Sequence, residues 1–255
     1  MTGQHHGPPA PLPIEGTYNF REIGGYPVAG GGQTRAGALY RSDALAGLTE
    51  AGRASVADLG LRRILDLRSG PELATDASAI EGLGIEVQHH PVLKAAAPRA
   101  QTHRRHSLET LYRLMVERRG QHLTDVVRAM SAADGPVLVH CTAGKDRTGL
   151  VVALILTAIG IDEETVVADY AATQANLAGE WTEGMLRKVR RFRVPVTDNL
   201  LEVLAHSPEA ALRDTLDWLD DEHGGVTAYL QSIGVDDTVV TSLRTALLPV
   251  REMGG

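Results

Sequence analysis

The apolar residues of this chain follow two spacings, one typical of strands and one typical of helices. Residues 61–69 (LRRILDLRS), 85–92 (IEVQHHPV) and 135–141 (GPVLVHC) have the pattern of short β-strands, and the last is an apolar run suited to a sheet covered on both faces. Between the last two strands, apolar residues from Leu108 to Met130 recur every three or four positions, as on one face of a helix. This alternation predicts an α/β fold with a mainly parallel central sheet flanked by helices.

The C-terminal half is predicted to be mostly helical. Residues 148–160 (TGLVVALILTAIG) are apolar almost all round, which indicates a helix that runs through the middle of the fold and ends at Gly160. Further helices are expected at residues 162–177, 207–225 and 236–248. The second of these has Ser207 as its predicted N-cap and Pro208 at its first position. Upstream, residues 19–45 combine paired glycines with alternating apolar residues, which predicts an N-terminal hairpin and long loops.

The composition is that of an ordinary globular protein, with 43% hydrophobic and 22% charged residues among 255. Neither an internal repeat nor a Ser/Gly linker divides the chain, so we expect one domain at residues 17–255 after a flexible Pro/Gly-rich tail at residues 1–16. The first 13 residues lack the apolar and basic regions of a signal peptide. We therefore expect a soluble, cytoplasmic protein, with secretion without a leader as the alternative.

Charge and cysteine content limit the partners and cofactors. A net charge of −7 disfavours a nucleic acid partner, because neutralising phosphates calls for a basic surface. The one cysteine, Cys141, excludes an intramolecular disulfide and a Cys-rich metal site. We expect neither a metal nor an organic cofactor.

Cys141 lies in a setting that favours chemistry. It ends a predicted strand, and residues 142–147 turn into the N-terminus of an apolar helix. The free N–H groups and the dipole of a helix N-terminus attract anions and favour a thiolate, while Arg147 offers a planar fork for two phosphate oxygens. A thiolate beside a phosphate-binding loop predicts phosphoryl transfer through a cysteinyl-phosphate intermediate. The alternative, a lone core cysteine, does not account for the polar run from Gly144 to Thr148.

The segment HCTAGKDRTG (140–149) resembles the signature loop of protein tyrosine phosphatases. Together with NFREIGGY (19–26), LYRSDAL (39–45), ILDLRS (64–69) and the pair Asp169–Tyr170, it is similar to the bacterial family of atypical tyrosine phosphatases, which includes phosphoinositide phosphatases. The resemblance extends from about Thr17 to the C-terminus. It implies a single tyrosine-phosphatase-like domain.

The same resemblance implies roles for the loop residues. Cys141 would be the nucleophile, Arg147 the phosphate clamp and Thr148 a hydroxyl that hydrogen-bonds the thiolate. Substrate-binding positions would be Thr142, Ala143, Gly144, Lys145 and Thr148. In this family a lysine at the position of Lys145 is associated with contacts to additional phosphates. His140 would support the cysteine, although a buried histidine bonded only to backbone is nearly as good an interpretation.

The general acid is not at its usual place, because residues 94–124 contain no aspartate. The candidates are Asp146 in the loop and Asp66 at the end of a neighbouring strand, and we favour Asp146. Asp66 could instead orient Arg147 or cap a turn. Arg21 and Arg68 are candidates for assisting phosphate binding, unless they are surface arginines without a role.

Residues 187–193 (RKVRRFR) carry five basic residues in an acidic protein, and the apolar residues from Trp181 to Phe192 can share one helical face. Two interpretations stay open. Lid helices at about residues 178–206 could cover the site and hold an acidic substrate or contact anionic lipid peripherally. Alternatively, this is a solvated helix that packs by its apolar side.

We expect a cysteine-dependent phosphatase that acts on phosphotyrosine, with phosphoserine, phosphothreonine and phosphoinositides as further substrates. Its partners would then be phosphorylated proteins or phosphoinositides, and its oligomeric state stays open. The alternatives are a phosphate-binding module without turnover and a lipid phosphatase. A sulfurtransferase and a P-loop NTPase fit the loop less well, because the first lacks the Arg-Thr-Gly entry to an apolar helix and the second needs Ser or Thr after the lysine.

Overall fold

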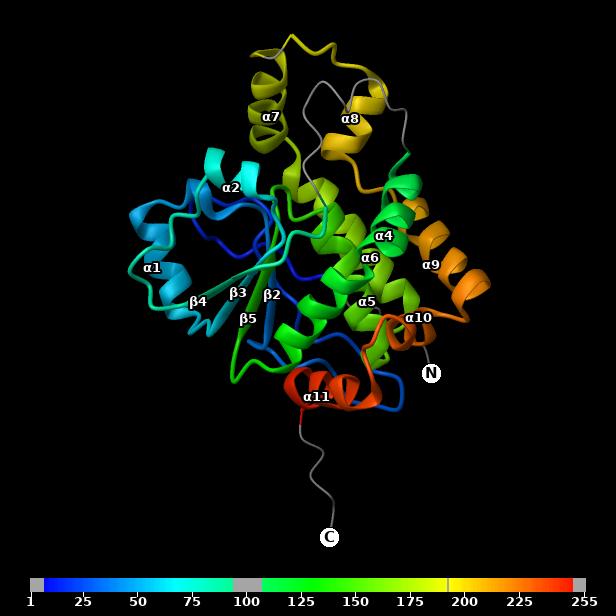
Figure 1. Ribbon diagram of the computed structural model, residues 1–255. Coiled ribbons are helices and arrows are strands. Elements are labelled where there is room, and N and C mark those ends of the chain that lie inside the picture. The colour runs from blue at the N-terminus through cyan, green and yellow to red at the C-terminus, as the bar shows by residue number, and fades with distance from the viewer. Residues whose placement is uncertain (1–6, 94–106, 192, 250–255) are drawn as a thin grey trace.

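The computed structural model describes residues 7–93, 107–191 and 193–249, which form a five-stranded sheet in the order β1-β2-β5-β3-β4 (Figure 1). The strands are β1 (Arg21–Glu22), β2 (Leu39–Ser42), β3 (Arg63–Asp66), β4 (Glu86–His89) and β5 (Val137–His140). All neighbouring pairs are parallel except β1 with β2. The loops that follow β2, β3 and β5 therefore meet at the carboxyl edge of the sheet.

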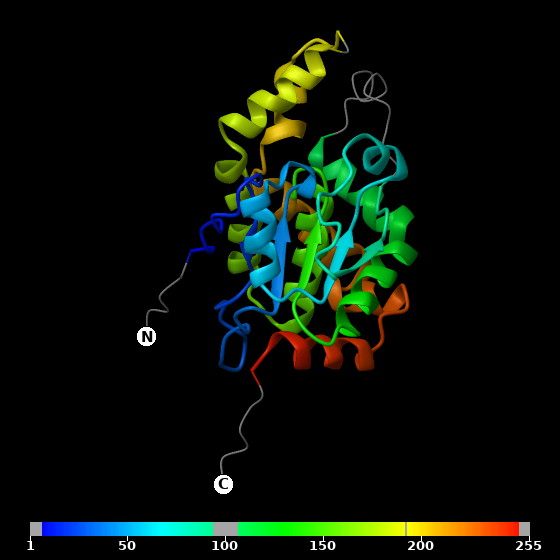
Figure 2. The ribbon, with the colours of Figure 1, turned by 90° about the vertical axis from the view of Figure 1, so that its left-hand side faces the viewer.

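Helices cover both faces of this sheet, with α1 on one side and α4, α5, α6 and α9 on the other (Figure 1). The helices are α1 (Glu50–Asp58), α2 (Gly70–Thr75), α4 (Leu108–Ser131), α5 (Asp146–Ile159), α6 (Glu163–Leu177), α7 (Glu180–Arg191), α8 (Asp198–Ala205), α9 (Glu209–His223), α10 (Val226–Ser232) and α11 (Asp237–Leu247). Figure 2 shows α7 beyond the carboxyl edge of the sheet and α11 beyond the opposite edge. Among the described residues, no helix is long and apolar enough to span a membrane.

Alternating side chains of the strands build two hydrophobic clusters. Leu65 and Val139 belong to the larger one, on the side of α4, α5 and α6. Ile64 and Leu138 belong to the smaller one, together with Val56 of α1. The centre of the larger cluster is α5, where every residue from Thr148 to Ile159 except Thr157 is buried. The apolar run from Leu150 to Leu156 follows from this position, because all of these residues are buried.

The predicted α/β class, its strands at 61–69, 85–92 and 135–141 and its mainly parallel sheet are confirmed, with the strands shorter than predicted. The N-terminal hairpin is only part of the arrangement, because β2 also pairs with β5 and so belongs to the main sheet. Beyond β3, residues 70–75 form the short helix α2. Ser69 and Glu72 form its capping box, and a proline in the first turn suits a helix start.

Two further boundaries differ from the prediction. Ser207 is not the N-cap of α9, which begins at Glu209 after Pro208. Its hydroxyl donates to the Ala171 carbonyl oxygen instead, at 3.1 Å, and so ties the segment to α6. The predicted tail at residues 1–16 is also too long. Ile14 is buried in the smaller cluster, while residues 1–6 lie outside the described residues.

One buried ionic cluster joins β1, β2 and α6. The carboxylate of Asp169 accepts hydrogen bonds from Arg21 Nε at 3.1 Å, from Tyr26 Oη at 3.0 Å and from Arg41 Nη1. Burial alone would raise the pKa of Asp169, but Arg41 and Arg21 outweigh it and hold that pKa below its usual range. Burial, together with the neighbouring Arg41, lowers the pKa of Arg21 to about 10, so this arginine stays charged at neutral pH. Removing the carboxylate would leave two cations buried without their counter-ion.

We predict that Asp169→Asn lowers the free energy of unfolding by about 3–5 kcal/mol, the usual cost of breaking a buried ion pair by removing one partner. Urea denaturation at pH 7 measures it. Because the folded-state pKa of Asp169 lies below its ordinary 3.8, its contribution is present above about pH 4 and is lost as the pH falls. The variant should therefore lose less stability on acidification than the parent protein.

The matched control is Asp217→Asn, which removes an exposed carboxylate from α9. It should change the free energy of unfolding by no more than about 0.5 kcal/mol. Equal effects of the two substitutions would show that the buried cluster is not a special source of stability.

Candidate active site

The predicted loop lies where β5 meets α5, at the carboxyl edge of the sheet. His140 ends β5, Asp146 begins α5, and Cys141 follows β5 with only 2% of its surface exposed. Gly144 has a φ of 65°, and a Cβ there would lie 2.3 Å from the Ser42 carbonyl oxygen, so glycine is required for the loop to pass this close to β2. The turn leads into the N-terminus of α5, where free N–H groups and the helix dipole favour an anion.

Two side chains from the N-terminal motifs hold the outer side of this loop. Asn19 Nδ2 donates to the carbonyl oxygens of Ala143 at 3.1 Å and Gly144 at 3.3 Å, and Arg41 Nη2 donates to that of Gly144 at 2.7 Å. Arg41 is itself fixed by Asp169. The C=O and N–H groups of a trans peptide point in opposite directions. The N–H groups of the peptides that follow Ala143 and Gly144 therefore point to the other side of the loop, where an anion can accept hydrogen bonds from them.

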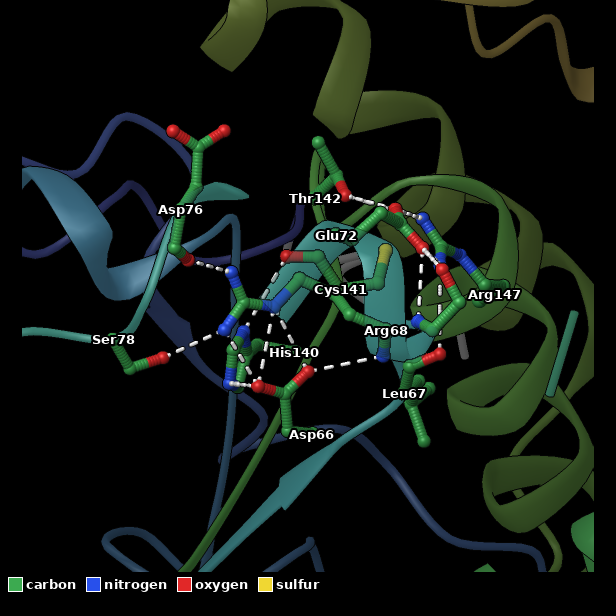
Figure 3. Close-up of polar contacts among 11 residues, drawn as sticks. Asp66, Leu67, Arg68, Glu72, Asp76, Ser78, His140, Cys141, Thr142 and Arg147 are labelled. Atoms are coloured by element: carbon green, nitrogen blue, oxygen red, sulfur yellow. Dashed lines mark hydrogen bonds and ion pairs between the residues drawn. The ribbon is translucent and has the colours of Figure 1, made fainter. Parts of the chain in front are cut away.

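Arg147 is paired with Glu72 of α2 across the loop (Figure 3). Its Nη1 and Nη2 each lie 2.8 Å from one oxygen of the Glu72 carboxylate, and the Thr142 hydroxyl donates to the same carboxylate. Burial alone would lower the pKa of Arg147, but the charge of Cys141 and the pairing with Glu72 raise it above its usual range. The guanidinium is therefore charged, held in one plane and electrostatically coupled to the cysteine.

Glu72 is a site residue that the sequence analysis did not identify. It occupies the third position of α2, where it accepts hydrogen bonds from the backbone N–H of Ser69 at 2.9 Å and from its hydroxyl at 2.7 Å. Burial would raise the pKa of Glu72, but the hydrogen bonds and charge of Arg147 outweigh burial and lower it to about 2. The Ser-x-x-Glu capping box just after DLR is the signal that could have located it.

Asp66 is buried and lies behind the loop, paired with Arg68. The carboxylate accepts from Arg68 Nη2 at 2.7 Å and lies 3.4 Å from His140 Nε2. Burial would raise the pKa of Asp66, but His140 and Arg68 outweigh it and hold the pKa well below its usual range. Arg68 also donates to the Asp76 carbonyl oxygen at 2.6 Å and to Ser78 at 2.8 Å (Figure 3). Asp66 is thus a permanently ionised partner of Arg68.

Arg21 and Arg68, considered for phosphate binding, are both buried and occupied by protein groups. The alternative of surface arginines without a role is therefore wrong, because each guanidinium is buried and paired with a carboxylate. His140 Nδ1 lies 3.4 Å from the Cys141 carbonyl oxygen and Nε2 lies 3.4 Å from Asp66 Oδ2, so the ring faces both backbone and a side chain. The buried Thr148 hydroxyl has no hydrogen-bond partner among the residues that the structure describes.

Asp146 is the first residue of α5, and its side chain is 21% exposed. Its Oδ1 accepts a hydrogen bond from the Tyr112 hydroxyl at 2.8 Å, and that hydroxyl lies 2.6 Å from the hydroxyl of Tyr170. Lys145 Nζ is 3.0 Å from the same oxygen. Tyr112 is a second residue that the sequence analysis missed, because its helical spacing marked it only as core. The carboxylate is thus oriented by neighbours while it keeps access to solvent.

Lys145 is directed away from solvent, toward the end of α8. Its ammonium donates to the carbonyl oxygens of Val203 and His206, each at 2.8 Å. The predicted lid segment forms the helices α7 and α8, which lie beyond the carboxyl edge (Figure 1). None of the described residues of α7 is buried, while Phe192 lies outside the described residues. No group of three His, Cys, Asp or Glu residues that could hold a metal ion occurs within the described ranges.

The chain resembles proteins of known family over nearly its whole length. The model of the tyrosine phosphatase family matches residues 12–249. The triple specificity protein phosphatase PtpB of Mycobacterium tuberculosis is 30% identical, over 92% of this chain and 98% of its own. A tyrosine-protein phosphatase of Nostoc commune is 28% identical, over 83% of this chain and 74% of its own.

Solved structures are more distant. P. aeruginosa TpbA in complex with pTyr has 17% identity and a TM-score of 0.39, with 74% of this chain and 99% of that chain covered. With a family model that spans nearly the whole chain and a relative of 30% identity matched over almost its full length, the chain belongs to the tyrosine phosphatase family and is a protein-tyrosine phosphatase.

Proposed function

We propose that the chain hydrolyses phosphotyrosine through a cysteinyl-phosphate intermediate on Cys141. The main support for this proposal is the placement of Cys141 and the paired Arg147 in one loop that leads into the N-terminus of α5. The hydrogen bonds from Asn19 and Arg41 to the carbonyl oxygens of Ala143 and Gly144 also support it. They leave the N–H groups of the same peptides pointing to the opposite side of the loop.

The reaction then has two steps. The Cys141 thiolate attacks phosphorus, an S–P bond forms, the P–O bond to tyrosine breaks, and the leaving oxygen takes a proton from a general acid. Water next attacks phosphorus, the S–P bond breaks, and the proton of the water passes to the carboxylate formed in the first step. Arg147 binds the non-bridging oxygens in both steps, where charge develops. Glu72 accepts from two of the five N–H groups of Arg147 at 2.8 Å, while the contacts to the Leu67 carbonyl oxygen at 3.5 Å and the Thr142 hydroxyl at 3.3 Å are longer. We therefore assign Glu72 the role of orienting Arg147, and phosphate would replace the longer contacts.

We assign the general acid to Asp146. It lies within the loop region, is partly exposed and is oriented by Tyr112. Asp66 is a poor candidate, because it is buried against Arg68 and its pKa is held far below neutrality. A group that is permanently ionised cannot donate the proton.

We further propose that phosphoserine, phosphothreonine and phosphoinositides are substrates. The relative PtpB bears the name triple specificity phosphatase, and Lys145 lies in the loop itself. The cationic residues of α7, which include Arg187, Arg190 and Arg191, would contact anionic lipid peripherally. A panel of phosphopeptides against phosphoinositides in vesicles tests this breadth, and a strong preference for the lipids would make the lipid phosphatase activity the main one.

Cys141→Ser should lower kcat for p-nitrophenyl phosphate by roughly 10³-fold or more, because a serine hydroxyl is not ionised near neutral pH. The variant should still bind phosphotyrosine, measured by isothermal titration calorimetry. Residual activity within tenfold of the parent protein would refute the covalent mechanism, and unchanged turnover without the thiol would point to another nucleophile.

Asp146→Asn should slow phenyl phosphate, a substrate with a poor leaving group, by about 10²–10⁴-fold, and p-nitrophenyl phosphate much less. Asp66→Asn is the matched comparison and should lower both rates by a similar factor, because it acts through Arg68. The ratio of the two kcat values is the measurement. A steep leaving-group dependence in Asp66→Asn alone would reverse the assignment.

Glu72→Gln should lower kcat/KM by roughly 10²-fold, because Arg147 would lose the charged partner that fixes its plane. The control is Glu86→Gln, which removes the carboxylate paired with Arg63 at 2.7 Å on β4, away from the loop. It should leave kcat/KM within twofold or so of the parent protein. Tighter binding of inorganic phosphate to Glu72→Gln would instead mean that Glu72 competes with the substrate.

A further inference from the structure

Two tyrosine hydroxyls and the carboxylate of Asp146 form a hydrogen-bond chain. The Tyr112 hydroxyl donates to Asp146 Oδ1 at 2.8 Å and lies 2.6 Å from the hydroxyl of Tyr170. Because Tyr112 has one hydroxyl hydrogen and directs it to Oδ1, Tyr170 is the donor in the second hydrogen bond. Each bond of the chain therefore has a fixed direction, from Tyr170 through Tyr112 to Asp146.

The chain is buried and is built by three helices. Tyr112 lies on α4, Tyr170 on α6, and Asp146 at the start of α5. The two tyrosines are buried, and their rings meet edge to face with centroids 6.0 Å apart and planes at 88°. Burial raises the pKa of both hydroxyls, so each keeps its hydrogen at neutral pH.

Gly149 makes room for Tyr170 beside the loop. A Cβ at this position would lie 2.9 Å from Cδ2 and 3.3 Å from Cε2 of the Tyr170 ring. The first distance is too short for two carbon atoms, which prefer about 3.5–4.0 Å. Gly149 follows Asp146 by three positions, so the two are neighbours on the surface of α5. The loop segment thus supplies both the carboxylate and the space for the tyrosines that hold it.

The contacts to Asp146 distinguish its two oxygens. Tyr112 donates to Oδ1, and Lys145 Nζ lies 3.0 Å from the same atom. Both neighbours are themselves fixed, Tyr112 by Tyr170 and Lys145 by carbonyl oxygens at the end of α8. A protonated carboxyl group has one acceptor oxygen and one oxygen that carries the hydrogen. Oδ1 fits the acceptor, which leaves Oδ2 to hold the proton.

We propose that Tyr112, held by Tyr170, is a positioning residue for the general acid. The hydroxyl chain fixes Oδ1 and so presents Oδ2 to the leaving oxygen in the first step and to the attacking water in the second. Tyr112 acts through Asp146 rather than on the substrate. This proposal rests on the proposed role of Asp146 as the general acid.

Tyr112→Phe tests the positioning role, since it removes the hydroxyl and keeps the ring. The kcat/KM for phenyl phosphate should fall by roughly tenfold and that for p-nitrophenyl phosphate by no more than about twofold, because only the poor leaving group needs a well-placed proton. Inhibition by inorganic phosphate should stay within about twofold of the parent protein, since the groups that bind phosphate are unchanged. An equal loss for both substrates would overturn the proposal.

Tyr170→Phe should show the same substrate dependence with a smaller loss, because it acts one hydrogen bond further from Asp146. A larger loss than in Tyr112→Phe would overturn the order of the chain. If Tyr112→Phe folds poorly, the double variant Tyr112→Phe/Tyr170→Phe is measured in its place, since it leaves neither hydroxyl buried without a partner.

The matched control is Tyr229→Phe. Tyr229 is also buried, and its hydroxyl donates to the Val116 carbonyl oxygen of α4 at 2.8 Å, to backbone rather than to the tyrosine chain. Both variants lose one buried hydrogen bond, so urea denaturation should show similar losses of stability. The ratio of the two kcat/KM values should change only in Tyr112→Phe. An equal change of the ratio in Tyr229→Phe would mean that lost packing, not positioning, is measured.

A double-mutant cycle separates this proposal from the assignment of the acid. In Asp146→Asn protein, Tyr112→Phe should lower kcat/KM for phenyl phosphate by no more than about twofold further, because the positioned group is gone. The full loss in both backgrounds would disprove action through Asp146. If Asp146→Asn alone shows no leaving-group dependence, the acid assignment fails and the positioning role with it. A steep dependence in Asp146→Asn with none in Tyr112→Phe rejects the positioning role alone.

Discussion

The carboxylate of Asp169, buried between two arginines, is the constraint on which the site depends. Asp169 lies on α6 and its arginine partners on β1 and β2, more than a hundred residues earlier in the chain, so the charge can be neutralised only when these elements are assembled. Arg41 also donates a hydrogen bond to the carbonyl oxygen of Gly144. A buried ion pair contributes little net stability against an apolar alternative, yet it is costly to break, which makes the arrangement specific. In this chain the ion pair holds Arg41 in one position, and Arg41 in turn holds the Gly144 peptide of the loop.

The loop is held from three sides by charged groups that are each already paired. Asp169 positions Arg41 beneath it, Glu72 positions Arg147 across it, and the end of α8 holds Lys145. Low dielectric makes each of these contacts strong and makes a missing partner costly. The conformation of the loop is therefore set before any substrate arrives, which is what electrostatic stabilisation of a developing charge requires.

The sequence was sufficient for the loop because its signals are local. A strand, a glycine turn and an apolar helix lie within about twenty residues around Cys141, and the structure has them there. It was insufficient for Glu72 and Tyr112, because their role arises from contacts across 75 and 34 residues of chain. The pairing of Asp66 with Arg68 spans only two residues, but it also could not be predicted from the sequence, because it depends on the conformation of the turn after β3. Ser207 was predicted to be an N-cap because Ser followed by Pro is a common sequence at helix starts. Its hydroxyl instead contacts Ala171 of α6, which is a tertiary contact that the local sequence does not show.

Substrate binding at such a site is an exchange of partners rather than the filling of an empty place. Arg147 can donate to a phosphate while it keeps Glu72 at 2.8 Å, if the phosphate replaces the longer contacts to the Leu67 carbonyl oxygen at 3.5 Å and the Thr142 hydroxyl at 3.3 Å. Lys145 is held on its buried side, since its ammonium donates to the Val203 and His206 carbonyl oxygens at 2.8 Å and lies 3.0 Å from Asp146 Oδ1. The arginine and the lysine of one loop thus differ in which partners hold them: a carboxylate from α2 for Arg147, and backbone carbonyl oxygens at the end of α8 for Lys145.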